Sequence, residues 1–214
     1  AKKFYLKEKN VLEDISLDLK GMYGSLKVDL CRPIPKRFLN RFNLITNYGT
    51  TEHVNNQYQV FKNIHDMCRL NGIIIHTLPV VNHWVNHCRY YYSQFFFMEL
   101  AKLCNYKILH IEIKNAYNPP RPKKNLIYVA LFKQNNNDFI LTKTFKTLKI
   151  FDSKNITYTG NYYTKKKIWL LLDHFVNKIP GKYLKRILRT IQCIYIENFS
   201  TNIYNIESSN PKNF

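Results

Sequence analysis

The chain has 214 residues, of which 45% are hydrophobic and 15% aromatic, and its formal net charge at pH 7 is +19. This length corresponds to about one domain, and the apolar fraction excludes a globally disordered chain. The apolar runs are much shorter than the roughly 20 residues of a membrane-spanning helix. Residues 1–10 are charged and do not resemble a secretory signal peptide. Because the sequence does not begin with methionine, we expect its true N-terminus to lie upstream.

Strands and helices are expected to alternate over the first two-thirds of the chain, where short β-branched runs alternate with helical patterns. This alternation predicts βαβ units and a mostly parallel sheet. Strands are expected over residues 13–19, 25–30, 42–48, 72–78, 107–113 and 126–132. Helical spacing predicts helices over residues 54–70 and 91–104, the second strongly apolar and carrying Phe95, Phe96, Met98, Leu100 and Leu103.

The last third of the chain is less regular. After a polar turn at residues 134–138, helices are expected over residues 165–179 and 182–194, followed by a frayed tail. These two helices carry clustered positive charge on Lys165, Lys166, Lys167, Lys182, Lys185, Arg186 and Arg189. Contact with nucleic acid or a ribonucleoprotein is one interpretation of this charge. A solvated face, in a composition rich in Lys, Asn, Ile and Tyr, is the other, and both stay open.

The cysteines point to a reducing environment. Five of them are scattered without a CxxC pair, which argues against a disulfide framework and against a four-cysteine zinc site. We therefore expect an intracellular protein of the cytoplasm or an organelle matrix, with no membrane partner.

The segment Phe42-Asn-Leu-Ile-Thr-Asn-Tyr-Gly-Thr-Thr-Glu-His-Val54 combines a buried strand, a glycine turn and a helix start. Ligands of open α/β sheets bind at such turns, because the turns follow the carboxyl ends of the strands. A glycine there lets the backbone approach a ligand closely. The segment is therefore the first candidate for a binding site.

Here the sequence resembles class I S-adenosylmethionine-dependent methyltransferases. More narrowly, it is similar to a methyltransferase-domain family with a Thr-Asn-x-Gly-Thr strand end before Glu-His-Val, an Asn-Ile-His-Asp helix, a Gly-Gly-x-x-x-His strand and a Trp-x-x-His loop. The corresponding segments are Asn63-Ile64-His65-Asp66, Asn71-Gly72-Ile73-Ile74-Ile75-His76 and Trp84-Val85-Asn86-His87, with Asn71 in place of the first glycine. The match covers roughly residues 12–133, in the family's order and spacing.

This resemblance implies a Rossmann-like methyltransferase sheet, mostly parallel with an antiparallel last strand, and S-adenosylmethionine as cofactor. An N-terminally incomplete core is expected over residues 1–133, and residues 134–214 would add the remaining strand, turns and the basic helical extension. Asp18 matches the acid that holds the ribose hydroxyls, since a carboxylate can accept two hydrogen bonds from a vicinal diol. Asp29 matches the residue beside the adenine ring. Asn47, Tyr48 and Gly49 match the loop that lines the methyl-donor pocket.

One part of the family pattern is missing. The glycine-rich turn that receives the methionine end of the cofactor should precede Asp18, but none of the six glycines does. Truncation of the sequence and loss of the cofactor loop both explain this, and residues 1–10 resemble the end of the helix after that turn.

The methyl acceptor is expected beside the loop that follows strand 72–78. Trp84, His87 and Tyr90 would shape its pocket, and His87 is the candidate general base because an imidazole titrates near neutrality. No metal site is predicted. A histidine pair four residues apart, such as His83 and His87, suits zinc on a helix with a third ligand, but residues 79–86 indicate a loop.

Glu52 and His53 can be explained without any chemical role. Glu52 suits a helix dipole, and His53 would pack beside the cleft without a chemical role. The sequence thus predicts a methyltransferase with an unidentified acceptor. The alternative is a catalytically inactive methyltransferase-like subunit that binds RNA or a ribonucleoprotein through its basic C-terminal half. A nicotinamide-dependent dehydrogenase is weaker, since it needs a glycine fingerprint.

Overall fold

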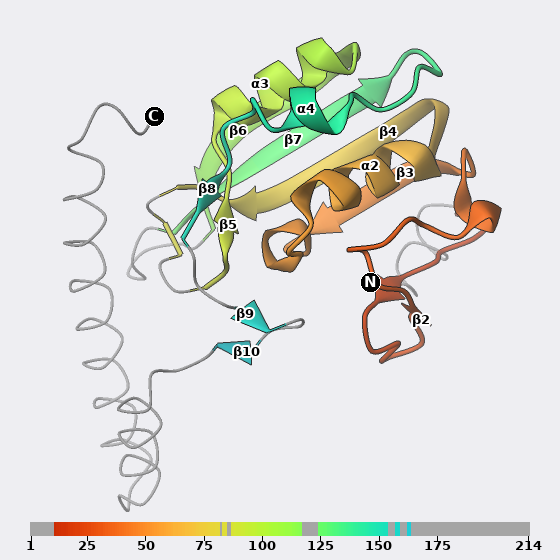
Figure 1. Ribbon diagram of the computed structural model, residues 1–214, viewed down its shortest axis with the longest axis horizontal. Coiled ribbons are helices and arrows are strands. Elements are labelled where there is room, and N and C mark those ends of the chain that lie inside the picture. Colours follow the sequence, from red (N-terminus) through yellow and green to blue (C-terminus); the bar gives the residue numbers. More distant parts are fainter. Residues whose placement is uncertain are drawn as a thin grey trace, which may run out of the picture.

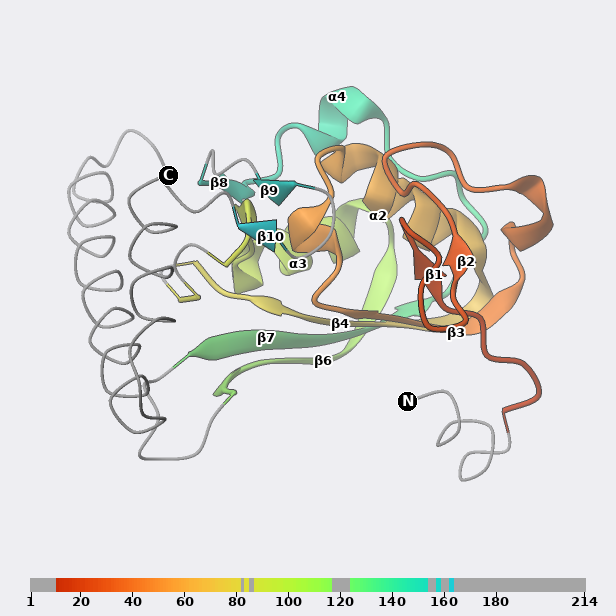
Figure 2. The same cartoon turned by 90° about the horizontal axis from the view of Figure 1, so that it is seen from below.

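The computed structural model describes residues 11–81, 83–84, 87–116, 124–153, 157–158 and 162–163. A four-stranded sheet forms its centre, and helices α2, α3 and α4 lie on one face of that sheet (Figures 1 and 2). The sheet consists of β3 (Phe42–Tyr48), β4 (Cys68–Pro79), β6 (Tyr106–Asn115) and β7 (Asn125–Lys133). The helices are α2 (Gln57–Met67), α3 (Gln94–Leu103) and α4 (Thr142–Phe145). The expected α/β fold class is confirmed.

The strand order of the central sheet is β3-β4-β7-β6. Strand β3 pairs with β4 in parallel, and β7 is antiparallel to both β4 and β6. Three strands therefore point the same way, and β7, the last of the four in the sequence, lies between β4 and β6 in the opposite direction. The family resemblance predicts a mostly parallel sheet with an antiparallel last strand; the observed sheet is mixed, with one parallel and two antiparallel strand pairings.

The two main helices begin at side-chain caps. Asn56 accepts a hydrogen bond from the backbone N–H of Gln59, and Ser93 accepts one from that of Phe96, which satisfies free amides at the start of α2 and α3. The predicted start of the second helix is wrong by three residues. Its place is taken by β5 (Tyr90–Tyr91), which pairs with the distant strand β8 (Phe151–Asp152).

Three of the apolar residues expected in this core helix are exposed in α3. Phe95, Met98 and Leu103 are 57%, 49% and 38% exposed. The residues that α3 buries are Phe96, Phe97, Leu100 and Ala101. The cap at Ser93 fixes the rotation of the helix, and neighbouring phenylalanines on a helix cannot all face one side.

An aromatic cluster joins the helices to the chain that follows the sheet. Phe61 of α2 lies 5.3 Å from Phe96 and 5.8 Å from Phe145 between ring centroids. Phe139 packs against Tyr58, with ring centroids 5.7 Å apart. Burial of such rings is a large share of the hydrophobic stabilisation of a domain of this size. Residues after the last sheet strand therefore contribute to the same core.

The strands predicted over residues 13–19 and 25–30 are shorter in the structure, where they are β1 (Leu17–Asp18) and β2 (Leu26–Lys27). These two strands form a parallel pair separate from the central sheet. The side chain of Asp18 accepts hydrogen bonds from the amides of Lys20 and Gly21, which turns the chain directly after β1. The remaining short elements are η1 (Lys36–Phe38), η2 (Thr51–His53), β9 (Thr157–Tyr158) and β10 (Tyr162–Tyr163).

The basic helices expected over residues 165–179 and 182–194 lie outside the described residues, and so do all seven of their basic side chains named above. Within the described ranges, no helix combines the length and apolar character needed to cross a membrane.

Candidate functional site

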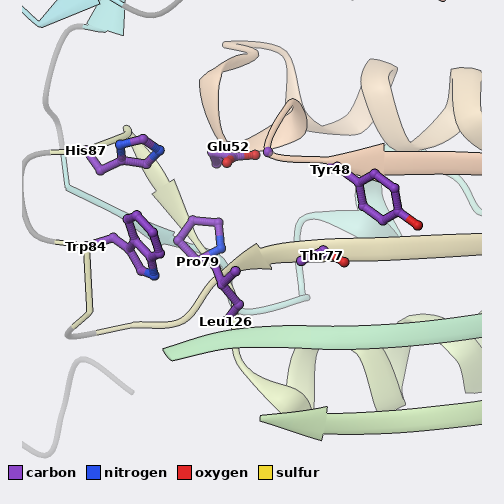
Figure 3. A pocket seen from close by; sticks show the side chains of 8 residues that line it. Tyr48, Glu52, Thr77, Pro79, Trp84, His87 and Leu126 are labelled. Atoms are coloured by element: carbon purple, nitrogen blue, oxygen red, sulfur yellow. The ribbon is translucent and has the colours of Figure 1, made fainter. Parts of the chain in front are cut away.

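A cavity of about 240 Å³ lies at the carboxyl ends of β3 and β4 (Figure 3). Ligands of open α/β sheets bind at this edge. The lining comes from the end of β3, the end of β4, the loop after β4 and the start of β7. Its residues are Tyr48, Gly49, Glu52, Thr77, Pro79, Trp84, His87 and Leu126.

Gly49 gives the turn after β3 its shape. Its φ is +69°, a left-handed conformation that costs other residues about 1–2 kcal/mol. A Cβ at this position would lie 3.3 Å from Oε1 of Glu52, and the Gly49 amide donates to the carbonyl of Thr77 at 3.1 Å. The glycine thus holds the turn against β4 and leaves space for the Glu52 carboxylate.

Asn47 lies beneath this turn and is 4% exposed. Its Nδ2 donates to Oγ1 of Thr51 and to Nδ1 of His76, both at 2.9 Å. Its Oδ1 accepts from the Thr51 amide at 3.3 Å. Asn47 is therefore occupied in fixing the turn, and it does not line the cavity, whereas Tyr48 and Gly49 do.

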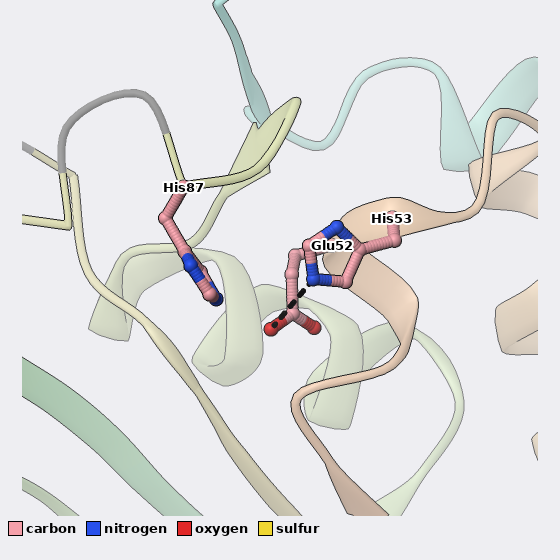
Figure 4. Close-up of side chains that lie close together, drawn as sticks. All are labelled: Glu52, His53 and His87. Atoms are coloured by element: carbon pink, nitrogen blue, oxygen red, sulfur yellow. Dashed lines mark ion pairs between the residues drawn. The ribbon is translucent and has the colours of Figure 1, made fainter. Parts of the chain in front are cut away.

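Glu52, His53 and His87 form a titratable cluster beside the cavity (Figure 4). The Glu52 side chain is 1% exposed. His53 Nε2 lies 4.0 Å from Glu52 Oε1, and the rings of His53 and His87 are 5.3 Å apart between centroids. Among the described residues, neither Oε2 of Glu52 nor Nδ1 of His53 has a hydrogen-bond partner. Unsatisfied buried polar atoms are uncommon and indicate a ligand or a functional role.

Burial controls the charges of the cluster. It raises the pKa of Glu52 to about 8. It lowers the pKa of His53 to about 4, with His87 adding to the shift. The pKa of His87 is lowered by burial and by the nearby Lys124. Near neutral pH both imidazoles are therefore unprotonated.

The loop after β4 is held in place by Trp84. This residue has a φ of +57°, and its Nε1 donates to the carbonyl of Asn125 at 2.9 Å. Its ring lies 5.3 Å from that of His87 between centroids. Trp84 and His87, two of the predicted acceptor-pocket residues, both line the cavity. Tyr90 does not, because its hydroxyl donates to the carbonyl of Asn55 and its ring is buried.

The two predicted cofactor aspartates lie away from the cavity lining. Asp18 is exposed and uses Oδ1 to accept from the amides of its own turn. Asp29 accepts from the Cys31 amide at 2.9 Å and approaches Nε of Arg32 at 3.5 Å. Each carboxylate has a structural task in its local turn.

Sequence reasoning missed the burial of Glu52 and the approach of His53 to His87. A usable signal was present, since Glu52 and His53 follow the end of one parallel strand and His87 follows the end of the next. Such ends meet at one edge of a sheet. The spacing of His83 and His87 suggests a different pair, but among the described residues His83 belongs to no metal-ligand group.

No protein-family model and no curated protein matches the sequence. Among solved structures, it is similar to the 1,6-didemethyltoxoflavin-N1-methyltransferase of Burkholderia thailandensis, which was crystallised with 1,6-didemethyltoxoflavin and S-adenosylhomocysteine. That match has 11% identity and a TM-score of 0.40, and covers 52% of this chain and 51% of that one. The CMeT domain of the citrinin polyketide synthase matches with 12% identity and a TM-score of 0.32, covering 48% of this chain and 31% of that one. Likenesses at these values carry no inference about activity.

Proposed function

We propose that this protein is an S-adenosylmethionine-dependent methyltransferase whose cavity at the end of β3 and β4 receives the methyl acceptor. The single observation that carries the proposal is the convergence of two loops on this cavity. Tyr48 and Gly49 of the predicted methyl-donor loop line one side, and Trp84 and His87 of the predicted acceptor loop line another. The strand order, with an antiparallel last strand, agrees with the fold that the sequence resemblance implies.

The residues at this edge suit the cofactor. Gly49 has no side chain, so the backbone of the turn can approach a ligand closely. Asp18 lies outside this edge, on the separate β1–β2 pair, and does not line the cavity; it is exposed and offers a carboxylate to a pair of hydroxyls. When bound, S-adenosylmethionine supplies an electrophilic methyl group that already carries a good leaving group.

The chain's own residues would align the acceptor and exclude water. Pro79, Trp84 and Leu126 give the cavity apolar walls, and a dry site strengthens the electrostatic interactions within it. Alignment of this kind can supply much of the rate enhancement of a direct displacement. His87 is unprotonated near neutral pH and lines the cavity, so it can accept a proton from an acceptor hydroxyl or amine.

Ligand-induced stabilisation of the full-length protein tests this function. A ligand that binds only the folded state at 100 times its Kd adds about 2.7 kcal/mol of stability and raises Tm. We expect S-adenosylmethionine and S-adenosylhomocysteine to raise Tm, and NADH to leave it unchanged. A rise with NADH alone would favour the dehydrogenase. No rise with any of the three in a folded protein would contradict both enzymes, and RNA binding would be measured next.

A further inference from the structure

The cluster of Glu52, His53 and His87 has the composition of a metal site. Each side chain offers one ligand atom, and all three atoms lie within 4.8 Å of one another. The residues come from two segments, η2 and the loop after β4, which the fold brings together at the carboxyl edge of the sheet (Figure 4). Such a convergence of distant donors is not a consequence of local sequence.

Two atoms of this cluster are unsatisfied within the described part of the chain. Oε2 of Glu52 and Nδ1 of His53 are buried and have no hydrogen-bond partner. A carboxyl group that is removed from water without a partner is costly, and buried polar groups in proteins are generally hydrogen-bonded or bound to a metal. A divalent cation among the three side chains would satisfy the Glu52 carboxylate and use the imidazole lone pairs.

The donor set indicates which ion would bind. Two imidazoles and one carboxylate suit Zn²⁺ and also Fe²⁺, whereas Mg²⁺ and Ca²⁺ prefer sites made of oxygen atoms. Bonds of about 2.0–2.2 Å to such an ion place neighbouring donors roughly 3–3.5 Å apart. His53 Nε2 lies 4.0 Å from Glu52 Oε1, and all three ligand atoms lie within 4.8 Å of one another, so the donors would have to approach by up to roughly 1–2 Å to bind one ion.

We propose that Glu52, His53 and His87 bind one divalent transition-metal ion of the zinc or ferrous class. Among the described residues, no fourth side chain joins this group. Since Glu52 and His87 also line the cavity, an ion bound to them would lie beside the space where a ligand would enter. Three protein ligands with an open position are typical of catalytic rather than structural zinc sites. The proposal goes beyond methyl transfer and does not depend on it; with the ion bound, His87 is a ligand and not the general base.

Calorimetric titration of the chelator-treated, full-length protein with ZnCl₂ tests the site. We expect one Zn²⁺ per chain, and no comparable binding of Mg²⁺. The variants Glu52→Gln, His53→Gln and His87→Gln should each weaken Zn²⁺ binding by at least about 10-fold, since even groups that only support a ligand contribute that much. The matched controls His83→Gln and His110→Gln should bind as the wild type does.

Two results would overturn the site. One is the absence of Zn²⁺ binding by the folded wild-type protein. The other is binding that survives Glu52→Gln and both cluster histidine variants. Far-UV circular dichroism verifies that each variant is folded. The absorption spectrum of the Co²⁺-loaded wild-type protein gives a readout that needs no variant, because visible bands of a nitrogen- and oxygen-ligated ion are expected and their absence contradicts the site.

Discussion

Asn47 of β3 and His76 of β4 are register partners in the parallel strand pair, and the Asn47 amide donates to Nδ1 of His76 at 2.9 Å. Both side chains are buried. Because an amide nitrogen can only donate, His76 is the neutral tautomer with its proton on Nε2. Burial lowers the pKa of His76 to about 3 and so supports this neutral form. The pair links the ends of the two strands that shape the cavity.

Replacing Asn47 should therefore destabilise the fold. Asn47→Ala leaves the buried nitrogen of His76 and the Thr51 hydroxyl without their partner, and a loss of roughly 1–3 kcal/mol in the free energy of unfolding is expected. Urea denaturation measures this loss. Asn43→Ala on the same strand is the control, since Asn43 is exposed and should change stability by less than about 0.5 kcal/mol. Equal losses for the two variants would contradict the account.

Gly49 is expected to matter for two separable reasons, its backbone conformation and its contact with Glu52. Gly49→Ala and Gly24→Ala should each cost about 1–2 kcal/mol in unfolding free energy, since both glycines have positive φ. Only Gly49→Ala places a methyl group 3.3 Å from the Glu52 carboxylate, whereas a Cβ on Gly24 has nothing within 4 Å. Zn²⁺ affinity should therefore fall for Gly49→Ala alone. A matching fall for Gly24→Ala would show that backbone strain, and not the contact, is responsible.

Acid sensitivity is expected from His65. Its Nε2 bonds to the carbonyl of Asn137 at 2.8 Å and must donate, so its Nδ1 accepts from the Tyr106 hydroxyl. Burial, followed by the nearby charge of Lys133, lowers the pKa of His65 to about 4 from an ordinary value of 6.5. A depressed pKa means that the stabilisation is complete above pH 6.5 and is lost as the pH falls towards 4.

His53 and His76 also become protonated as the pH falls, but they do so in both proteins. The comparison of wild type with His65→Gln therefore isolates the contribution of His65. Urea denaturation between pH 7 and 4 should give a shallower pH dependence for the variant, by up to about 1.4 kcal/mol per pH unit. Parallel curves for the two proteins would rule out His65 as a source of acid sensitivity.

The position of strand β3 could be predicted from the sequence, because short apolar runs between turn residues have few other conformations. Its expected burial was wrong, since β3 is an edge strand and its Leu44 is 43% exposed. The antiparallel last strand was implied by the family resemblance alone. The start of α3 could not be predicted from the sequence. Tyr90 and Tyr91 suit a helix or a strand, and pairing with the distant residues of β8 decides the outcome. Lys133 is similar, since it looks like a solvated strand end but is 2% exposed and donates to the carbonyls of His65 and Cys68. Tertiary contacts, which local patterns do not contain, fix both.

The candidate site was predictable only in part. Tyr48, Gly49, Trp84 and His87 follow strand ends, and their place at the cavity follows from the sheet topology. The burial of Glu52 depends on the packing of β4, β5 and α2 against η2, which no local pattern reveals. The role of Asn47 could not be predicted from local patterns either. Its side-chain amide bonds to Thr51 and His76 and does not face the cavity.

Calorimetric binding of S-adenosylmethionine to the full-length protein tests the central claim most directly. Asp18→Asn is the informative variant, because an amide keeps the oxygen that the turn uses but lacks the second carboxylate oxygen for a ribose hydroxyl. Asp138→Asn, at another exposed aspartate, is the matched control. We predict micromolar binding that Asp18→Asn weakens and Asp138→Asn does not. No binding by a folded full-length protein would contradict the methyltransferase and favour a subunit without that activity.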